Sequence, residues 1–138
     1  MKIISKSVEQ TLSIGKDFAK TLQGGDIVLL DGDLGAGKTH FTKGVALGLN
    51  VDGIVTSPTF TLHNIYQGEK LILNHFDFYR IEDEEEAEQL GLSEIFYDKN
   101  GVCFVEWAQN VSNLLPLNCK KITITIIDND TREITING

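Results

Sequence analysis

Apolar and polar residues follow one another along the chain in two patterns, one typical of helices and one typical of strands. After Ser7, apolar residues recur at about helical spacing as far as the glycine pair Gly24–Gly25, and a second such stretch begins at Lys38. Two unbroken apolar runs, Ile27–Leu30 and Val102–Val105, have the length and composition of buried strands. The pattern therefore predicts two amphipathic helices and two buried strands.

Alternating apolar and polar residues predict two β-hairpins, formed by Thr61–Tyr66 with Lys70–Tyr79 and by Lys120–Ile127 with Thr131–Asn137. Met1–Ser5 is expected to add a short edge strand. Alternation within the first hairpin puts Asp77 on the same face as leucines. Packing alone explains the leucines but not Asp77, because a carboxylate is costly to bury without a cation.

An acidic run, Glu82–Glu86, follows the first hairpin. Carboxylates are stabilised near the N-terminus of a helix, so the run favours the solvated start of a helix. The alternative is a docking patch for a basic partner. Further along the chain, Gly91–Asp98 predicts a second short helix.

The 138 residues suffice for one domain with its own core, so residues 1–138 are expected to form a single domain. No apolar run approaches the length of a membrane span, and the N-terminal segment lacks the apolar core of a signal peptide. We therefore expect a cytoplasmic protein without membrane contact. The formal charge of −8 argues against binding nucleic acid through bulk electrostatics, so any contact with RNA is expected to be indirect or weak.

A phosphate-binding motif lies between the first buried strand and the second helix. Gly32, Gly37, Lys38 and Thr39 match the spacing G-x-x-x-x-G-K-T. The glycines let successive N–H groups point at a phosphate chain, and the helix N-terminus adds the positive end of its dipole. Lys38 supplies a charge for the β- and γ-phosphates, and Thr39 is placed to bind Mg²⁺. The expected nucleotide-binding residues are Asp33, Leu34, Gly35, Ala36, Gly37, Lys38, Thr39 and His40.

Two carboxylates complete the candidate site. Glu106 directly follows the second buried strand. In P-loop proteins a carboxylate at such a strand end reaches Mg²⁺ directly or through water, so Glu106 and Thr39 are the expected metal-binding residues. A surface acid at a strand end is the plainer interpretation of Glu106. Asp77 is expected to orient or activate water, which makes Lys38, Asp77 and Glu106 the candidate catalytic residues.

Four motifs, in this order, resemble those of the TsaE (YjeE) family: GDLGAGKT at Gly32–Thr39, SPTF at Ser57–Phe60, HFDFYR at His75–Arg80 and EW at Glu106–Trp107. The resemblance covers nearly the whole chain, and four ordered motifs are much more specific than a P-loop alone. The chain departs from the family pattern at Ala108, where a proline usually follows the EW pair.

The family is the bacterial P-loop ATPase of the pathway that forms threonylcarbamoyladenosine (t6A) at position 37 of tRNA. The resemblance implies an α/β fold, a P-loop NTPase-like three-layer domain with a mixed, mainly parallel central sheet and β-hairpin additions. It implies ATP and Mg²⁺ as cofactors, and the other proteins of the t6A-forming complex, TsaB and TsaD, as partners. It also implies a switch-like role for Ser57–Phe60 and site roles for Asp77 and Glu106–Trp107.

Three other functions share part of this pattern. A small-molecule kinase usually needs a lid that carries arginines, and Arg80 and Arg132 are the only arginines in the chain. A GTPase usually carries the motif N-K-x-D, which the chain lacks. A module that binds nucleotide without hydrolysing it is the remaining alternative function. Because phosphoryl transfer gains from a cation at the developing charge, an ATPase with so few arginines is expected to act slowly without partners.

Overall fold

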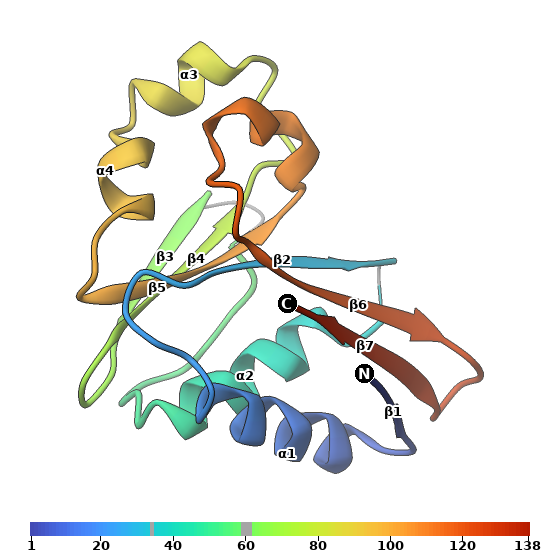
Figure 1. Ribbon diagram of the computed structural model, residues 1–138. Coiled ribbons are helices and arrows are strands. Elements are labelled where there is room, and N and C mark those ends of the chain that lie inside the picture. Colours follow the sequence, from blue (N-terminus) through green and yellow to red (C-terminus); the bar gives the residue numbers. More distant parts are fainter. Residues whose placement is uncertain (34, 59–61) are drawn as a thin grey trace.

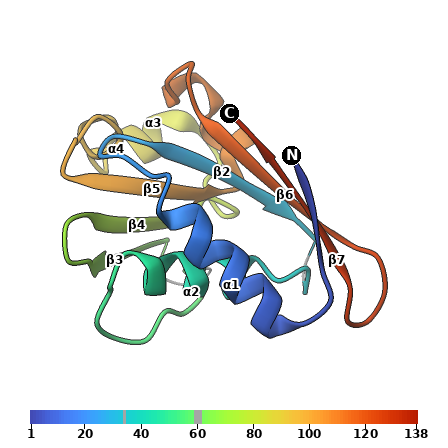
Figure 2. The ribbon, with the colours of Figure 1, turned by 60° about the horizontal axis from the view of Figure 1, so that its bottom comes forward.

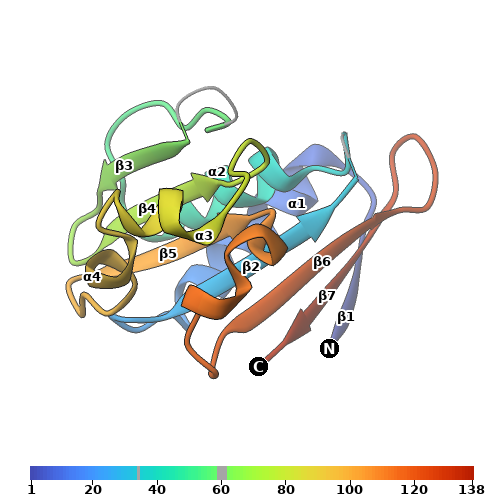
Figure 3. The same cartoon turned by 90° about the horizontal axis from the view of Figure 1, so that it is seen from above.

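The computed structural model describes residues 1–33, 35–58 and 62–138, and within these ranges seven strands form one mixed sheet (Figure 1). The strands lie side by side in the order β1-β7-β6-β2-β5-β4-β3, with β2 in the middle (Figure 3). Their bounds are Lys2–Ser5 (β1), Ile27–Gly32 (β2), His63–Gln67 (β3), Ile72–Asp77 (β4), Gly101–Glu106 (β5), Lys120–Ile126 (β6) and Arg132–Asn137 (β7).

Parallel pairing is confined to the middle of the sheet. β2 pairs in parallel with both β5 and β6, and β5 pairs in parallel with β4. The outer pairs, β3 with β4, β6 with β7 and β1 with β7, are antiparallel. The predicted mixed sheet with a parallel core, an edge strand and two hairpins is therefore confirmed.

Helices cover both faces of the sheet, which gives the predicted three layers (Figure 2). One face carries α1 (Val8–Ala19) and α2 (Lys38–Gly48); the other carries α3 (Glu84–Glu88), α4 (Leu92–Phe96) and the 3₁₀ helix η1 (Ala108–Leu114). Successive residues of a strand point to opposite faces. Accordingly, Val102 and Phe104 pack into the apolar cluster beneath α1 and α2, whereas Cys103 and Val105 pack into the cluster beneath α3 and α4. No helix in the described part of the chain is long and apolar enough to span a membrane.

Local sequence explains most element boundaries. Ser7 caps α1 by accepting from the N–H of Gln10 at 3.1 Å. The helix ends at Ala19, earlier than the glycine pair predicts, because the next turn tightens into i to i−3 bonds such as Leu22 N–H to Ala19 O. Asp83 caps α3 by accepting from the N–H of Glu86 at 2.9 Å, so the acidic run begins a helix as predicted.

The first hairpin is shorter than predicted. β4 ends at Asp77 and the chain turns at Tyr79–Arg80, so strand alternation does not extend to Arg80. Thr61, the predicted start of the hairpin, lies outside the described residues. The short helix predicted over Gly91–Asp98 is confirmed as α4.

Glycines let α1 and α2 approach each other closely. A Cβ atom on Gly15 would lie 2.4 Å from the carbonyl oxygen of Phe41, and one on Gly44 would lie 2.2 Å from that of Leu12. Real Cβ atoms do not come this close to backbone atoms. Gly15 is therefore a contact point at which α2 packs against α1.

We expect Gly44→Ala to lower the free energy of unfolding by about 1–3 kcal/mol, because the added methyl forces the two helices apart. The better helix propensity of alanine, worth about 1 kcal/mol, acts in the opposite direction. Leu47→Ala on the exposed side of α2 is the control and should change stability by no more than about 0.5 kcal/mol. Urea unfolding measures both, and a Gly44→Ala protein as stable as wild type would contradict the close-packing account.

Candidate functional site

The phosphate-binding loop connects β2, the middle strand of the sheet, to the N-terminus of α2. Gly35 and Gly37 have positive φ angles of 82° and 105°, which side chains other than glycine rarely tolerate. The N–H of Ala36 closes the turn on the carbonyl oxygen of Asp33 at 2.9 Å. The loop thus has the curled form that the motif predicts, with a helix beginning at Lys38.

A cleft of about 680 Å³ opens above this loop at the carboxyl ends of the parallel strands. Six of the predicted nucleotide-binding residues line it: Asp33, Gly35, Gly37, Lys38, Thr39 and His40. Ala36 does not, because its methyl group is buried in the core under α1 and α2. Leu34 lies outside the described residues. Ligands of open α/β sheets bind at this edge, so the cleft has the position expected of a nucleotide site.

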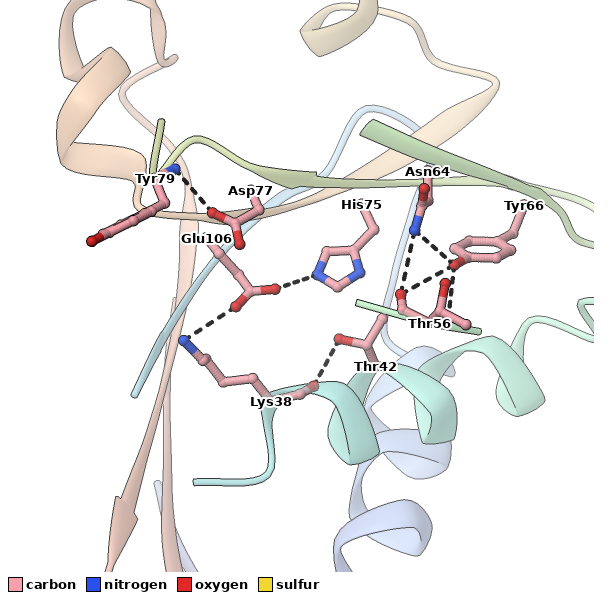
Figure 4. A network of polar contacts seen from close by, with 9 residues as sticks. All are labelled: Lys38, Thr42, Thr56, Asn64, Tyr66, His75, Asp77, Tyr79 and Glu106. Carbon is pink, nitrogen blue, oxygen red and sulfur yellow. Dashed lines mark hydrogen bonds and ion pairs between the residues drawn. The ribbon is translucent and has the colours of Figure 1, made fainter. Parts of the chain in front are cut away.

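The two predicted carboxylates stand at the ends of neighbouring strands. Asp77 and Glu106 are register partners at the last positions of β4 and β5. Both side chains belong to buried residues and both line the cleft. Asp77 accepts a hydrogen bond from the N–H of Tyr79 at 2.9 Å, which orients its carboxylate at the start of the turn (Figure 4).

Glu106 links the phosphate-binding loop to the strands. Its Oε1 lies 3.2 Å from the Lys38 ammonium, and its Oε2 lies 2.7 Å from Nε2 of His75 (Figure 4). Burial by itself raises the pKa of the Glu106 carboxyl, but the hydrogen bond and charge of His75, together with Lys38, outweigh burial and hold the pKa below its ordinary value. Glu106 is therefore an ionised, doubly contacted carboxylate, and the interpretation as a plain surface acid is wrong.

His75 completes this contact from inside the protein. Its ring is fully buried, and Nδ1 has no hydrogen-bond partner among the described residues. Nε2 carries a proton and donates it to Glu106, because an ionised carboxylate can only accept a hydrogen bond. His75 thus fixes the orientation of Glu106, which in turn contacts Lys38.

The walls of the cleft hold further parts of the predicted motifs. Ser57 lines the cleft, and the preceding residue, Thr56, is tied to β3 because its N–H donates to the hydroxyl of Tyr66 at 3.1 Å. Thr59 and Phe60, the last two residues of the SPTF motif, lie outside the described residues. At the mouth, the rings of Tyr79 and Trp107 pack with centroids 4.8 Å apart, and both remain partly exposed.

The donor chemistry of the cleft fits magnesium. No group of three His, Cys, Asp or Glu side chains within residues 1–33, 35–58 and 62–138 is arranged to hold a metal by itself. Mg²⁺ does not need such a cage, since it takes hard oxygen ligands, keeps several waters and shares substrate phosphates. The Thr39 hydroxyl and the carboxylates of Asp77 and Glu106 are oxygen donors of this kind in one cleft.

Comparison with known proteins identifies the family. The model of the family described as threonylcarbamoyl adenosine biosynthesis protein TsaE matches residues 5–134. The chain belongs to the TsaE family. The tRNA threonylcarbamoyladenosine biosynthesis protein TsaE of Bacillus subtilis is 49% identical over 94% of this chain and 80% of its own length. The TsaE protein of Treponema pallidum is 40% identical over 99% of both chains.

The fold of the chain also matches a solved TsaE-like structure. The crystal structure of Bacillus subtilis YdiB superposes with a TM-score of 0.85 at 40% identity, covering 100% of this chain and 84% of that one. The α/β architecture predicted from the TsaE resemblance is therefore confirmed. Ala108, where the family pattern has proline, is the first residue of η1, so the 3₁₀ helix forms without it.

Two site contacts escape analysis of the sequence. The motifs include His75, but its bond to Glu106 depends on the parallel pairing of β4 with β5, which local patterns do not specify. The side chain of Arg132 in β7 donates to the carbonyl oxygens of Gly35 and Ala36 in the phosphate-binding loop. The last hairpin therefore contacts the site as well as extending the sheet. No local pattern in the sequence indicates this contact.

The lowered pKa of Glu106 predicts a pH-dependent contribution to stability. Since the folded chain binds this proton less readily than the unfolded chain, the contribution is present above the ordinary value of 4.5 and is lost as pH falls through the folded-state pKa. Wild type should therefore lose stability relative to Glu106→Gln on acidification. Urea unfolding of both proteins from neutral pH to about pH 3, in the presence of EDTA, measures the difference across the range below 4.5 where the contribution is lost. A difference that does not change with pH would contradict the lowered pKa.

Proposed function

We propose that this protein binds ATP with Mg²⁺ and hydrolyses it as an accessory protein of the tRNA t6A37 modification complex, in the cytoplasm. The contact that carries the proposal is the one between Lys38 of the phosphate-binding loop and Glu106. It brings the motif that binds phosphate within 3.2 Å of a buried carboxylate at the neighbouring strand end. Membership of the TsaE family supports the pathway, since the matching relatives are named for t6A biosynthesis.

Phosphate binding is the part of the function that the loop itself performs. Backbone N–H groups of the loop and the N-terminus of α2 attract the phosphates. The Lys38 ammonium has three donors, so it can contact the phosphates and keep one bond to Glu106. Thr39 and Glu106 would hold the Mg²⁺ ion, which neutralises charge on the β- and γ-oxygens when bound.

Hydrolysis requires a water molecule in line with the γ-phosphate. Asp77 is held by Tyr79 N–H beside Glu106, in a position to orient that water or accept its proton. Glu106 is ionised and oriented by His75, so it is suited to hold metal or a metal-bound water rather than to donate a proton. The two carboxylates then have different roles at neighbouring strand ends.

The alternative functions fit the site less well. Among the described residues that line the cleft there is no arginine, whereas a small-molecule kinase usually closes an arginine-bearing lid on its substrates. A binding module without turnover is the remaining alternative, and only a measurement of phosphate release distinguishes it from an ATPase.

Partner proteins supply the missing cation in this proposal. With no arginine among the described lining residues, we expect the isolated chain to hydrolyse ATP slowly and TsaB and TsaD to accelerate it. Four exposed acids of the run before and within α3 offer a negative surface that would attract a basic partner: Glu82, Asp83, Glu85 and Glu86. Contact with tRNA is then indirect, through the partners.

Lys38→Ala should weaken ATP–Mg²⁺ binding about tenfold to a hundredfold, because it removes a charge-assisted contact worth roughly 1.5–3 kcal/mol. Lys43→Ala is the matched control, since Lys43 lies on the same helix but does not line the cleft. Isothermal titration calorimetry measures both affinities. Equal ATP affinity in folded wild-type and Lys38→Ala protein would refute the assignment of this loop.

Asp77→Asn and Glu106→Gln should reduce the rate of ATP hydrolysis at least about tenfold while changing ATP affinity much less. Their contacts strengthen as charge develops in the transition state. Phosphate release is measured for the chain alone and with purified TsaB and TsaD. Wild type should release phosphate faster with these partners than alone. Normal turnover in both variants would exclude these roles. The absence of phosphate release under every condition would favour the non-hydrolysing module.

A further inference from the structure

One arginine of the last hairpin reaches the phosphate-binding loop. Arg132 is the first residue of β7, yet its Nε donates to the carbonyl oxygen of Ala36 at 3.0 Å and its Nη2 to that of Gly35 at 3.2 Å. These residues are 96 and 97 positions apart from Arg132 in the chain. The sheet makes the contact possible, because β6 pairs with β2 and places the β6–β7 turn beside the loop that follows β2.

The third nitrogen of the Arg132 guanidinium forms hydrogen bonds within the β6–β7 turn. Its Nη1 donates to the carbonyl oxygens of Asp128 at 2.7 Å, Thr131 at 3.1 Å and Asn129 at 3.3 Å. Every hydrogen bond of this guanidinium within the described residues is thus to a backbone carbonyl, and no carboxylate there forms an ion pair with it. Attraction to the Asp128 carboxylate in the same turn offsets part of its positive charge, and the remainder adds to the field of the loop.

The two loop carbonyls belong to peptide groups that matter for phosphate binding. In a trans peptide the C=O and the following N–H point in opposite directions. The carbonyl of Ala36 is therefore paired with the N–H of Gly37, a residue that lines the cleft. A donor that holds this carbonyl on the outer side of the loop turns the N–H of Gly37 away from Arg132. The carbonyl of Gly35 fixes the N–H of Ala36 in the same way, and that group closes the turn on Asp33.

We propose that Arg132 is a positioning residue of the phosphate-binding loop, which fixes the peptide planes on both sides of Ala36 and raises nucleotide affinity from outside the cleft. The inference rests on the proposed binding of ATP to this loop. It differs from a role in folding alone, in which Arg132 only closes the turn between β6 and β7 and the loop binds phosphate equally well without it.

A matched pair of variants separates these two roles. Arg132→Met removes the guanidinium while keeping much of the aliphatic stem. Asp128→Ala loosens the same turn, since Oδ1 of Asp128 accepts from the N–H groups of Thr131 at 2.9 Å and Asp130 at 3.0 Å. The second variant leaves both bonds from Arg132 to the loop in place. Arg132→Lys keeps the charge without the planar fork and serves as the conservative variant.

Calorimetric titration with ATP–Mg²⁺ is the test, with folding of each variant checked by circular dichroism. We expect Arg132→Met to bind about tenfold more weakly than wild type, the effect of losing one charge-assisted hydrogen bond. The ATP affinity of Arg132→Lys should lie between those of wild type and Arg132→Met. Asp128→Ala should bind ATP like wild type even if its melting temperature falls. If Arg132→Met does not fold, the ATP affinities of Arg132→Lys and Asp128→Ala distinguish a role in positioning the loop from a role in closing the turn.

Four results would count against the proposal, and they are distinguishable. Wild-type affinity in folded Arg132→Met would overturn it, as would an equal loss in Asp128→Ala, which would assign the effect to the turn. If Arg132→Met does not fold, wild-type ATP affinity in Arg132→Lys together with weaker ATP binding by Asp128→Ala would also overturn the proposal. Absence of ATP binding by wild type would instead contradict the proposed function, and this inference with it.

Discussion

The buried carboxylate of Glu106 needs hydrogen-bond donors, and the rest of the site depends on the residues that supply them. Both of its oxygens are contacted, one by Lys38 from α2 and one by His75 from β4. Removing either donor would leave a charge in a place where water has little access, which is far more costly than losing an exposed ion pair. The contact therefore ties the end of β5 to the start of α2 and to the neighbouring strand.

The central position of β2 is what brings separate parts of the chain to one loop. On one side, β5 delivers Glu106, and β4 beyond it delivers His75 and Asp77. On the other side, β6 and its antiparallel partner β7 deliver Arg132. The phosphate-binding loop is thus held from two directions, by a carboxylate that contacts its lysine and by a guanidinium that contacts its carbonyls. In this arrangement the last hairpin is a support of the site as well as an addition to the sheet.

What the sequence predicts correctly depends on chemistry that is local to each segment. The strand–loop–helix form of the phosphate-binding motif, the cap at Ser7 and the apolar runs of β2 and β5 each follow from neighbouring residues, and all are confirmed. The partners of Glu106 and Arg132 depend on strand order and register, which arise from packing over the whole chain. For that reason His75 is visible as a motif residue but not as the partner of Glu106. The sequence around Arg132 contains no pattern that indicates its contact with the loop.

The charge balance of the cleft adds a constraint on what it binds. Among the described residues that line it, the carboxylates of Asp31, Asp33, Asp77 and Glu106 outnumber the one lysine, Lys38. The whole chain is also acidic, with a formal charge of −8. A bare polyphosphate would meet net repulsion from these walls, which the loop N–H groups and Arg132 offset only in part. A phosphate chain that carries a divalent cation would reverse this balance, because the carboxylates would attract the cation. For the proposed binding of ATP, the electrostatics of the cleft thus favour the magnesium complex over the free nucleotide.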